Sequence, residues 1–245
     1  MNILITGGTK GIGKATALRF SEPGNKLFLN YFHDDEAANT AFMEVTAKGG
    51  TPYLLKCNVG NYMEVKEMTD IIKQEVDTID LIVHCATGII RGDSLEIDPE
   101  DWRKTVEVSS LSLIDITREL RPLLKYGSTI IALSSKGASK ATPKYAALGT
   151  TKAFTEAIIR YMAVELAPQG IRANVVSAGA LDTEAYRTMF GENAGPRLEA
   201  TKRNNPSGRN LRFEDVTETI AFLARPEAQM IQGEIIHIDG GMSLR

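Results

Sequence analysis

The fold is decided by the stretch Asn2-Ile3-Leu4-Ile5-Thr6-Gly7-Gly8-Thr9-Lys10-Gly11-Ile12-Gly13. Residues 2–6 form an apolar, β-branched run that predicts a strand, and residues 14–20 repeat apolar side chains with helical spacing. Glycines between them allow the backbone to approach a pyrophosphate closely, where the amides of a helix start face its negative charge. The order strand, glycine turn and helix therefore predicts a nucleotide site, the alternative being a tight connection without a ligand.

The same alternation of strand and helix continues along the chain. Apolar runs at 26–31, 53–57, 79–84, 129–133, 172–176 and 234–238 predict six more strands. Helical patterns lie near 36–47, 63–75, 101–124, 145–166 and 215–224. Strands that are apolar on both faces and alternate with helices predict an α/β fold, a doubly wound parallel sheet of the Rossmann type with about seven strands in a single domain, 1–245. Ligands of such sheets bind beyond the carboxyl ends of the strands.

Composition excludes several classes of protein. The 245 residues are 43% hydrophobic and 24% charged with a net charge of -3, which argues against a nucleic-acid binder or a protein of anionic membranes. No apolar run approaches 18 residues, so no signal peptide or membrane span is expected. The two cysteines and three histidines show no metal-ligand spacing, which predicts no metal and a reducing, cytoplasmic location.

Tyr145 and Lys152 offer a phenol and an ammonium just after the predicted fifth strand. Seven residues are nearly two helical turns, so both side chains would leave the same face of a helix. An amphipathic surface face is the alternative interpretation of this pair. Its place at the ligand edge of the sheet favours an active site.

Residues 181–212 lack a clear period and are polar, with several glycines and prolines. They follow the sixth strand at the ligand edge. A disordered surface loop is one interpretation; the one favoured here is a mobile flap over the substrate at about 181–212.

Short motifs lie along the whole chain. They are Thr6 to Gly13, Asn58-Val59, Ala86-Thr87-Gly88, Val108 to Ser112, Ser177-Ala178-Gly179 and Ile238 to Gly241. These motifs resemble those of the short-chain dehydrogenase/reductases, which implies a nicotinamide dinucleotide as cofactor. Most members place a catalytic Tyr four residues before Lys, but that position holds Leu148. The Tyr-x6-Lys spacing of Tyr145 and Lys152 is similar to that of the enoyl-acyl-carrier-protein reductases, most of all the NADPH-dependent enoyl reductase III branch.

The resemblance implies roles for individual residues. Tyr145 would stabilise the enolate oxygen, Lys152 would hold the nicotinamide ribose, and Ser135 would orient the substrate where many enoyl reductases have a second Tyr. Thr183 would contact the cofactor, unless it only caps a helix. The expected cofactor-binding residues are Gly7, Thr9, Lys10, Gly11, Ile12, Gly13, Tyr31, His33, Asn58, Val59, Ala86, Lys152, Gly179, Leu181 and Thr183.

NADPH is expected in preference to NADH. NAD enzymes usually carry an acid at the end of the second strand, where this chain has Asn30-Tyr31-Phe32-His33. Lys10 and His33 would face a 2′-phosphate, whereas Asp34 and Asp35 argue for NADH.

The leading hypothesis is an enoyl-thioester reductase of fatty-acid or polyketide synthesis, with the acyl chain on an acyl carrier protein. Basic side chains in or beside the flap would meet an acidic carrier, or form a solvated face: Arg197, Lys202, Arg203, Arg209 and Arg212. The alternatives are a 3-oxoacyl or other carbonyl reductase and a catalytically silent NADP-binding sensor or scaffold. The family implies a homotetramer, formed through the helices that carry Trp102 and Tyr145.

Overall fold

The computed structural model describes residues 1–244, and its centre is one parallel sheet in the order β3-β2-β1-β4-β5-β6-β7. Arg245, the last residue of the predicted domain, lies outside the described residues. The sheet confirms the predicted α/β, doubly wound fold. Its strands are β1 (Asn2–Thr6), β2 (Lys26–Tyr31), β3 (Thr51–Lys56), β4 (Ile79–His84), β5 (Leu124–Ser135), β6 (Arg172–Ala178) and β7 (Ile235–Ile238).

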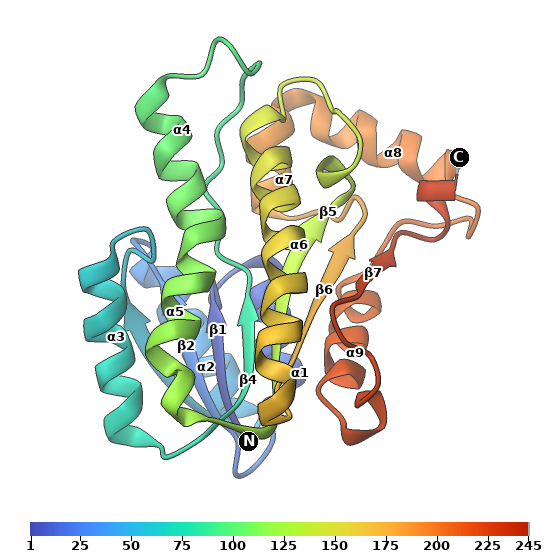
Figure 1. Cartoon of the computed structure of the whole chain (residues 1–245). Helices are drawn as coiled ribbons and strands as arrows, with labels where there is room; N and C mark the ends of the chain where they lie inside the picture. Colours follow the sequence, from blue (N-terminus) through green and yellow to red (C-terminus); the bar gives the residue numbers. More distant parts are fainter. Residues whose placement is uncertain (245) are drawn as a thin grey trace.

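Helices cover both faces of this sheet, as Figure 1 shows. One layer is α1 (Gly11–Arg19), α2 (Asp35–Ala47) and α9 (Phe213–Leu223), and the other is α3 (Tyr62–Glu75), α5 (Ser112–Leu120) and α6 (Ala146–Leu166). Successive residues of β1 enter opposite cores: Leu4 packs in one, Ile3 and Ile5 in the other, and all three are fully buried. Burial on both faces explains why β1 is apolar from Ile3 to Ile5.

The helix predicted over 101–124 is interrupted. The structure has α4 (Pro99–Val106), a π-helical segment (Glu107–Leu111), α5 and a 3-10 turn (Arg121–Leu123). Ser109 and Ser110 in the π-helical segment are fully buried. The hydroxyl of Ser109 accepts from the Gly88 amide at 2.9 Å, and that of Ser110 donates to the Thr151 carbonyl at 3.0 Å. The wider turn thus directs two polar side chains into the interior.

The segment 181–212, which shows no clear period in the sequence, is helical over much of its length. It holds α7 (Glu184–Phe190) and α8 (Ala194–Asn204), which lie beyond the carboxyl ends of the strands (Figure 1). The Thr183 hydroxyl caps α7 by accepting from the Tyr186 amide at 3.0 Å. Only Ala194 and Leu198 are buried in α8, too few to give a readable period. The mobility of this flap stays a prediction.

None of the helices formed by residues 1–244 has the length and apolar character needed to cross a bilayer. Within the same residues, no three His, Cys, Asp or Glu side chains are grouped as a metal site would require.

Candidate active site and cofactor cradle

Ser135 and Tyr145 meet where β5 ends and α6 begins. Their hydroxyl oxygens lie 3.2 Å apart, within hydrogen-bond distance. The prediction that Tyr145 lies inside the helix is wrong, because Tyr145 is the N-cap residue and α6 starts at Ala146. Lys144, just before it, has a φ of 61°, a left-handed conformation that turns the chain into the helix. Tyr145 therefore has a backbone geometry that helical spacing does not describe.

The Tyr145 ring lies against the backbone of Gly137. A Cβ at position 137 would be 2.4 Å from the Cε1 atom of this ring, so only glycine fits. On the α7 side the ring of Phe190 is parallel to it, with the centroids 6.0 Å apart. Burial raises the pKa of the Tyr145 phenol, and the hydrogen bond with Ser135 lowers it to a smaller extent. The phenol therefore stays protonated at neutral pH and can donate.

Lys152 lies in the interior of α6 with only 6% of its surface exposed. Within residues 1–244 its ammonium has no hydrogen-bond or ion-pair partner. Burial lowers its pKa from 10.5 to about 8. The buried His84 at the end of β4 has a pKa lowered to about 3, by burial first and then by the charge of Lys152. A lysine whose pKa is strongly lowered by burial and that has no protein partner is typical of functional sites.

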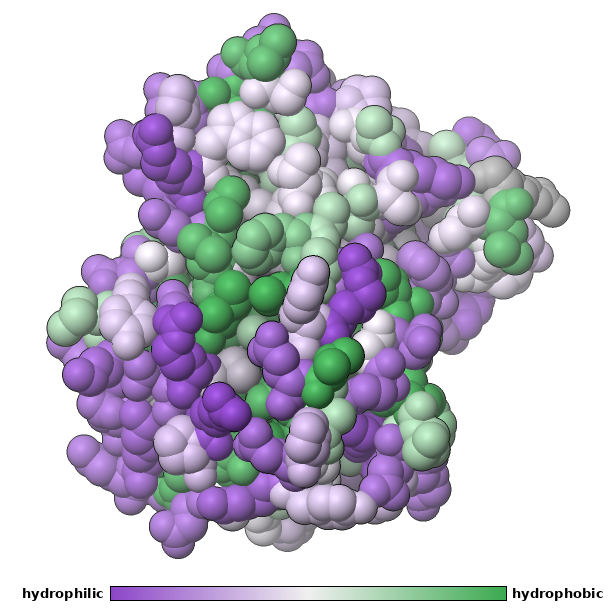
Figure 2. Space-filling model, in the orientation of Figure 1, coloured by the Kyte–Doolittle hydropathy of each residue, from purple (hydrophilic) through white to green (hydrophobic). Residues whose placement is uncertain are grey.

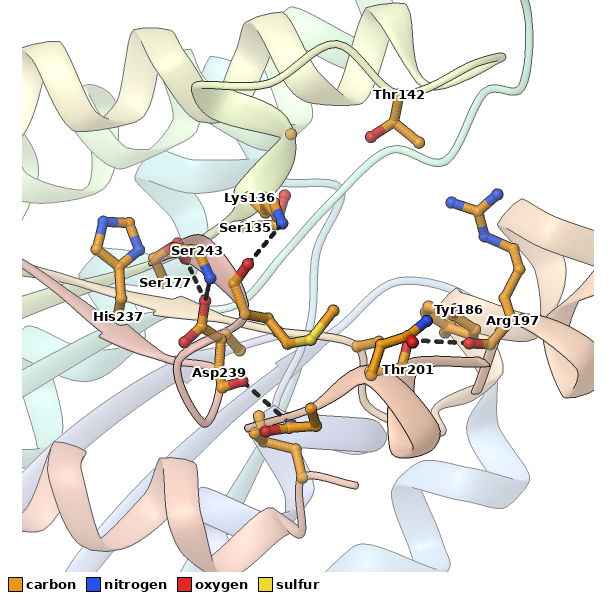
Figure 3. A pocket seen from close by; sticks show the side chains of 18 of the residues that line it. Ser135, Lys136, Thr142, Ser177, Tyr186, Arg197, Thr201, His237, Asp239 and Ser243 are labelled. Atoms are coloured by element: carbon orange, nitrogen blue, oxygen red, sulfur yellow. Dashed lines mark hydrogen bonds between the residues drawn. The ribbon is translucent and has the colours of Figure 1, made fainter. Parts of the chain in front are cut away.

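A cavity of about 500 Å³ opens between the ends of β5, β6 and β7 and the helices α7 and α8. Figure 3 shows polar side chains from all these elements around it. Tyr186 and Phe190 form an aromatic wall, with ring centroids 4.6 Å apart, and the Arg197 guanidinium lies 4.2 Å from the centre of the Phe190 ring. Ser135 and Tyr145 belong to the same lining. Tyr145 and Ser135 therefore line the same cavity as residues of the predicted flap.

The glycine turn between β1 and α1 forms the second part of the site. A Cβ at Gly13 would lie 2.1 Å from the Gly7 carbonyl oxygen, so the turn closes only with glycine there. The Thr6 hydroxyl accepts from the Cys85 and Ala86 amides at 3.1 and 3.0 Å, which joins the ends of β1 and β4. This close backbone turn at the start of a helix fits the pyrophosphate of a dinucleotide.

The other predicted cofactor residues lie at the same edge. Thr183 adjoins the turn, since a Cβ at Gly11 would be 3.7 Å from its methyl group. Asn58 uses its side-chain oxygen to accept from the Gly60 amide at 3.1 Å. The remaining ones are Thr9, Ile12, Val59, Ala86, Gly179 and Leu181, of which Thr9, Val59, Ala86 and Leu181 are buried.

Tyr31 and His33 are turned to other partners. The Tyr31 hydroxyl donates to Asp35 at 2.9 Å, and the His33 ring packs edge-on against Phe32. Neither lines the pocket of about 400 Å³ that adjoins the glycine turn. Instead, Asp34 reaches this pocket and forms an ion pair with Lys10. The loop after β2 therefore brings Asp34, one of the two acids that argue for NADH, into this pocket.

Comparison with known proteins decides the family. The model of the family described as "Enoyl-(Acyl carrier protein) reductase" matches residues 7–243. The chain belongs to this family. The resemblance predicted from the motifs is thereby confirmed.

Relatives of this enoyl-(acyl carrier protein) reductase family member are named for more than one activity. The 1-cyclohexenylcarbonyl-CoA reductase of Streptomyces collinus is 30% identical over 98% of this chain and 86% of the relative. The 3-oxoacyl-[acyl-carrier-protein] reductase of Synechocystis is 31% identical over 98% of this chain and 95% of the relative. The crystal structure of an enoyl-[acyl-carrier-protein] reductase (NADH) from Aquifex aeolicus superposes with a TM-score of 0.90 at 29% identity, covering 100% of this chain and 96% of that one.

Sequence reasoning missed several residues that shape the site of this family member. Gly137 has no role that the sequence indicates, and only the ring packed on it shows why it is glycine. Phe190 and Tyr186 stood in a segment without a readable period. Aromatic side chains in the first helix of a predicted flap were a signal that could have pointed to a pocket wall.

Proposed function

We propose that this protein is an enoyl-thioester reductase, which delivers hydride to the β-carbon of a 2-enoyl thioester. The observation that carries the proposal is the partly buried Tyr145 phenol, 3.2 Å from Ser135 in the wall of the large cavity. Leu148, four residues before Lys152, is buried and offers no proton. Conjugate reduction places the developing negative charge on the thioester oxygen, away from the carbon that receives hydride. A displaced phenol suits this separation.

The chain's own side chains would stabilise that charge. A reduced nicotinamide dinucleotide, when bound, supplies the hydride. Tyr145 donates a hydrogen bond to the thioester oxygen as it becomes an enolate oxygen, an effect of about 2 to 4 kcal/mol. Lys152 adds a buried positive charge and holds the ribose hydroxyls, which would supply the partners that its ammonium lacks. Ser135 holds the Tyr145 hydroxyl and orients the substrate.

The membership of the family supports a nicotinamide dinucleotide as cofactor. NADPH, the III branch and a cytoplasmic location stay predictions. Two observations weigh against NADPH: the Aquifex structure is named for NADH, and Lys10, the expected partner of a 2′-phosphate, is paired with Asp34.

An acyl carrier protein is the proposed donor of the substrate, as the family name suggests. Arg197 lies at the cavity, and Lys202 and Arg203 lie in the last turn of α8, all exposed. Arg209 is already paired with Asp215 at 2.6 Å, which leaves a smaller basic face than the sequence predicted. A coenzyme A ester is the alternative, since the Streptomyces relative is named for one.

A homotetramer is proposed from the apolar surface of α6. Tyr161 and Val164 are 67% and 76% exposed, and Phe154 is 40% exposed. Figure 2 shows apolar side chains gathered over α5 and α6 in the middle of this face. A second copy of the chain would cover such a patch.

The test supplies crotonyl- and acetoacetyl-thioesters separately, as carrier-protein and as coenzyme A esters, with NADPH and with NADH. Oxidation of the cofactor with the crotonyl ester supports the proposal. Turnover of the acetoacetyl ester alone would favour the second candidate, a 3-oxoacyl reductase. The similarity to the Synechocystis relative supports that candidate. Cofactor binding without turnover of either ester would favour the sensor or scaffold.

A further inference from the structure

The pocket beside the glycine turn is charged. It has a volume of about 400 Å³, and its lining includes Lys10, Lys14, Asp34, Glu36 and Glu184. Three acids face two bases, so the lining carries one excess negative charge. This is the place at which the adenosine ribose of a dinucleotide lies when its pyrophosphate binds the turn.

Lys10 is held by carboxylates from two distant parts of the chain. Its ammonium pairs with Asp34 and lies 2.8 and 3.1 Å from the two carboxylate oxygens of Glu184. Both contacts raise the pKa of Lys10, that with Asp34 more than that with Glu184. Asp34 is fixed in place, because it also caps α2 by accepting from the Ala37 amide at 2.9 Å. Lys14, the other base, is paired with Glu44 at 2.7 Å.

We propose that Glu184 is a specificity-determining residue: together with Asp34 it withholds Lys10 from a 2′-phosphate, so that the pocket prefers an unphosphorylated adenosine ribose. A phosphate monoester carries about -1.5 to -2 charges at neutral pH and would have to displace two carboxylates from one ammonium. Ribose hydroxyls, by contrast, can donate to these carboxylates. This preference opposes the NADPH expected from the sequence. It rests on the dinucleotide alone and not on the enoyl activity.

The position of Glu184 makes the arrangement unusual. An acid at the end of β2 is the ordinary discriminator in such folds. Glu184 instead comes from α7, which also carries the aromatic wall of the cavity. One short helix thus contributes to both pockets.

The test measures equilibrium binding to the full chain by calorimetry, with NADPH and NADH and with the fragments 2′,5′-ADP and ADP. In Glu184→Gln we expect NADPH and 2′,5′-ADP to bind about tenfold more tightly, equivalent to about 1.4 kcal/mol, while NADH and ADP change less than twofold. Glu192→Gln is the matched control, since it removes the same charge from an exposed residue outside both linings.

The double variant Lys10→Met/Glu184→Gln decides the mechanism. If Glu184 acts by holding Lys10, the gain in NADPH affinity disappears in the double variant. An unchanged NADPH-to-NADH ratio in Glu184→Gln, or an equal change in Glu192→Gln, would overturn the proposal. Because the readout is binding, this result is independent of which thioester the enzyme reduces.

Discussion

The large cavity and the pocket at the glycine turn use ionisable side chains in opposite ways. At the cavity, burial raises the pKa of Tyr145, and within helix α6 burial lowers that of Lys152 to about 8, so each group is pushed toward its neutral form. At the glycine turn, hydrogen bonds raise the pKa of Lys10 and lower that of Asp34, so both charges are favoured. Burying Tyr145 and Lys152 disfavours their charged forms, whereas the contacts between Lys10 and Asp34 favour theirs.

Function constrains the charges of these two regions to different degrees. Exposed ion pairs contribute about 0 to 1 kcal/mol each, so the charges around Lys10 can change without loss of the fold. A buried ammonium without a partner is destabilising and is retained only where chemistry or binding needs it.

Tyr145→Phe removes the donor from the cavity. We expect kcat to fall by about 10²- to 10³-fold, because the developing oxyanion loses one hydrogen bond, while the Kd of the cofactor stays within about twofold. Steady-state kinetics and calorimetry measure the two effects. Tyr161→Phe, which removes an exposed hydroxyl from α6, is the control. Full turnover in Tyr145→Phe would exclude Tyr145 from the mechanism.

Gly13→Ala forces a Cβ to within 2.1 Å of the Gly7 carbonyl oxygen. We expect a loss of about 3 kcal/mol in the free energy of unfolding and weaker cofactor binding, because the backbone of the turn must open. Urea unfolding measures the first effect. Gly195→Ala is the matched control, since nothing lies within 4 Å of its added Cβ. Equal stability of both variants would show that the turn tolerates a side chain.

Lys152→Met should make the cofactor-free protein more stable at pH 7, by up to about 3 kcal/mol, while it weakens cofactor binding. The pKa of Lys152 is about 8 in the folded chain and 10.5 in the ordinary reference state, so the unfolded chain binds more protons between these values. The wild type should therefore gain stability as pH rises from about 8 to 10.5, and the variant should lack this gain.

Urea unfolding from pH 7 to 10.5 measures this difference, with the exposed Lys202→Met as control. If the free energy of unfolding depends on pH equally in Lys152→Met and in the wild type, burial of Lys152 does not destabilise the fold.

Lys144→Asn gives the smallest effect. It removes ion pairs with Asp93 and Glu96 but keeps a residue that tolerates the positive φ. We expect less than about 1 kcal/mol in the free energy of unfolding and kcat/KM within about threefold. A larger fall in kcat would show that these exposed pairs hold the loop that precedes Tyr145.

The sequence predicted the alternating strands and helices, because their patterns are local. It missed contacts between side chains from distant segments. All seven strands and the placement of Ser135 and Tyr145 at one strand end followed from apolar runs and their order. The pairing of Lys10 with Glu184 joins residues 174 positions apart, and no local pattern indicates it. Tyr145 as an N-cap rather than a helical residue depends on the positive φ of Lys144, which propensity does not favour.

The π-helical segment Glu107–Leu111 has a consequence for how this chain can change over generations. Such a segment holds one residue more than an α-helical path would. Deleting one residue there would restore a regular helix and leave α5 in phase with α4, because the wider turn already absorbs the extra residue. Leu113 and Ile116 would stay buried. Ser109 and Ser110 would lose the turn that directs their hydroxyls to the Gly88 amide and the Thr151 carbonyl. A single-residue deletion in this segment should therefore keep the core and break these two hydrogen bonds.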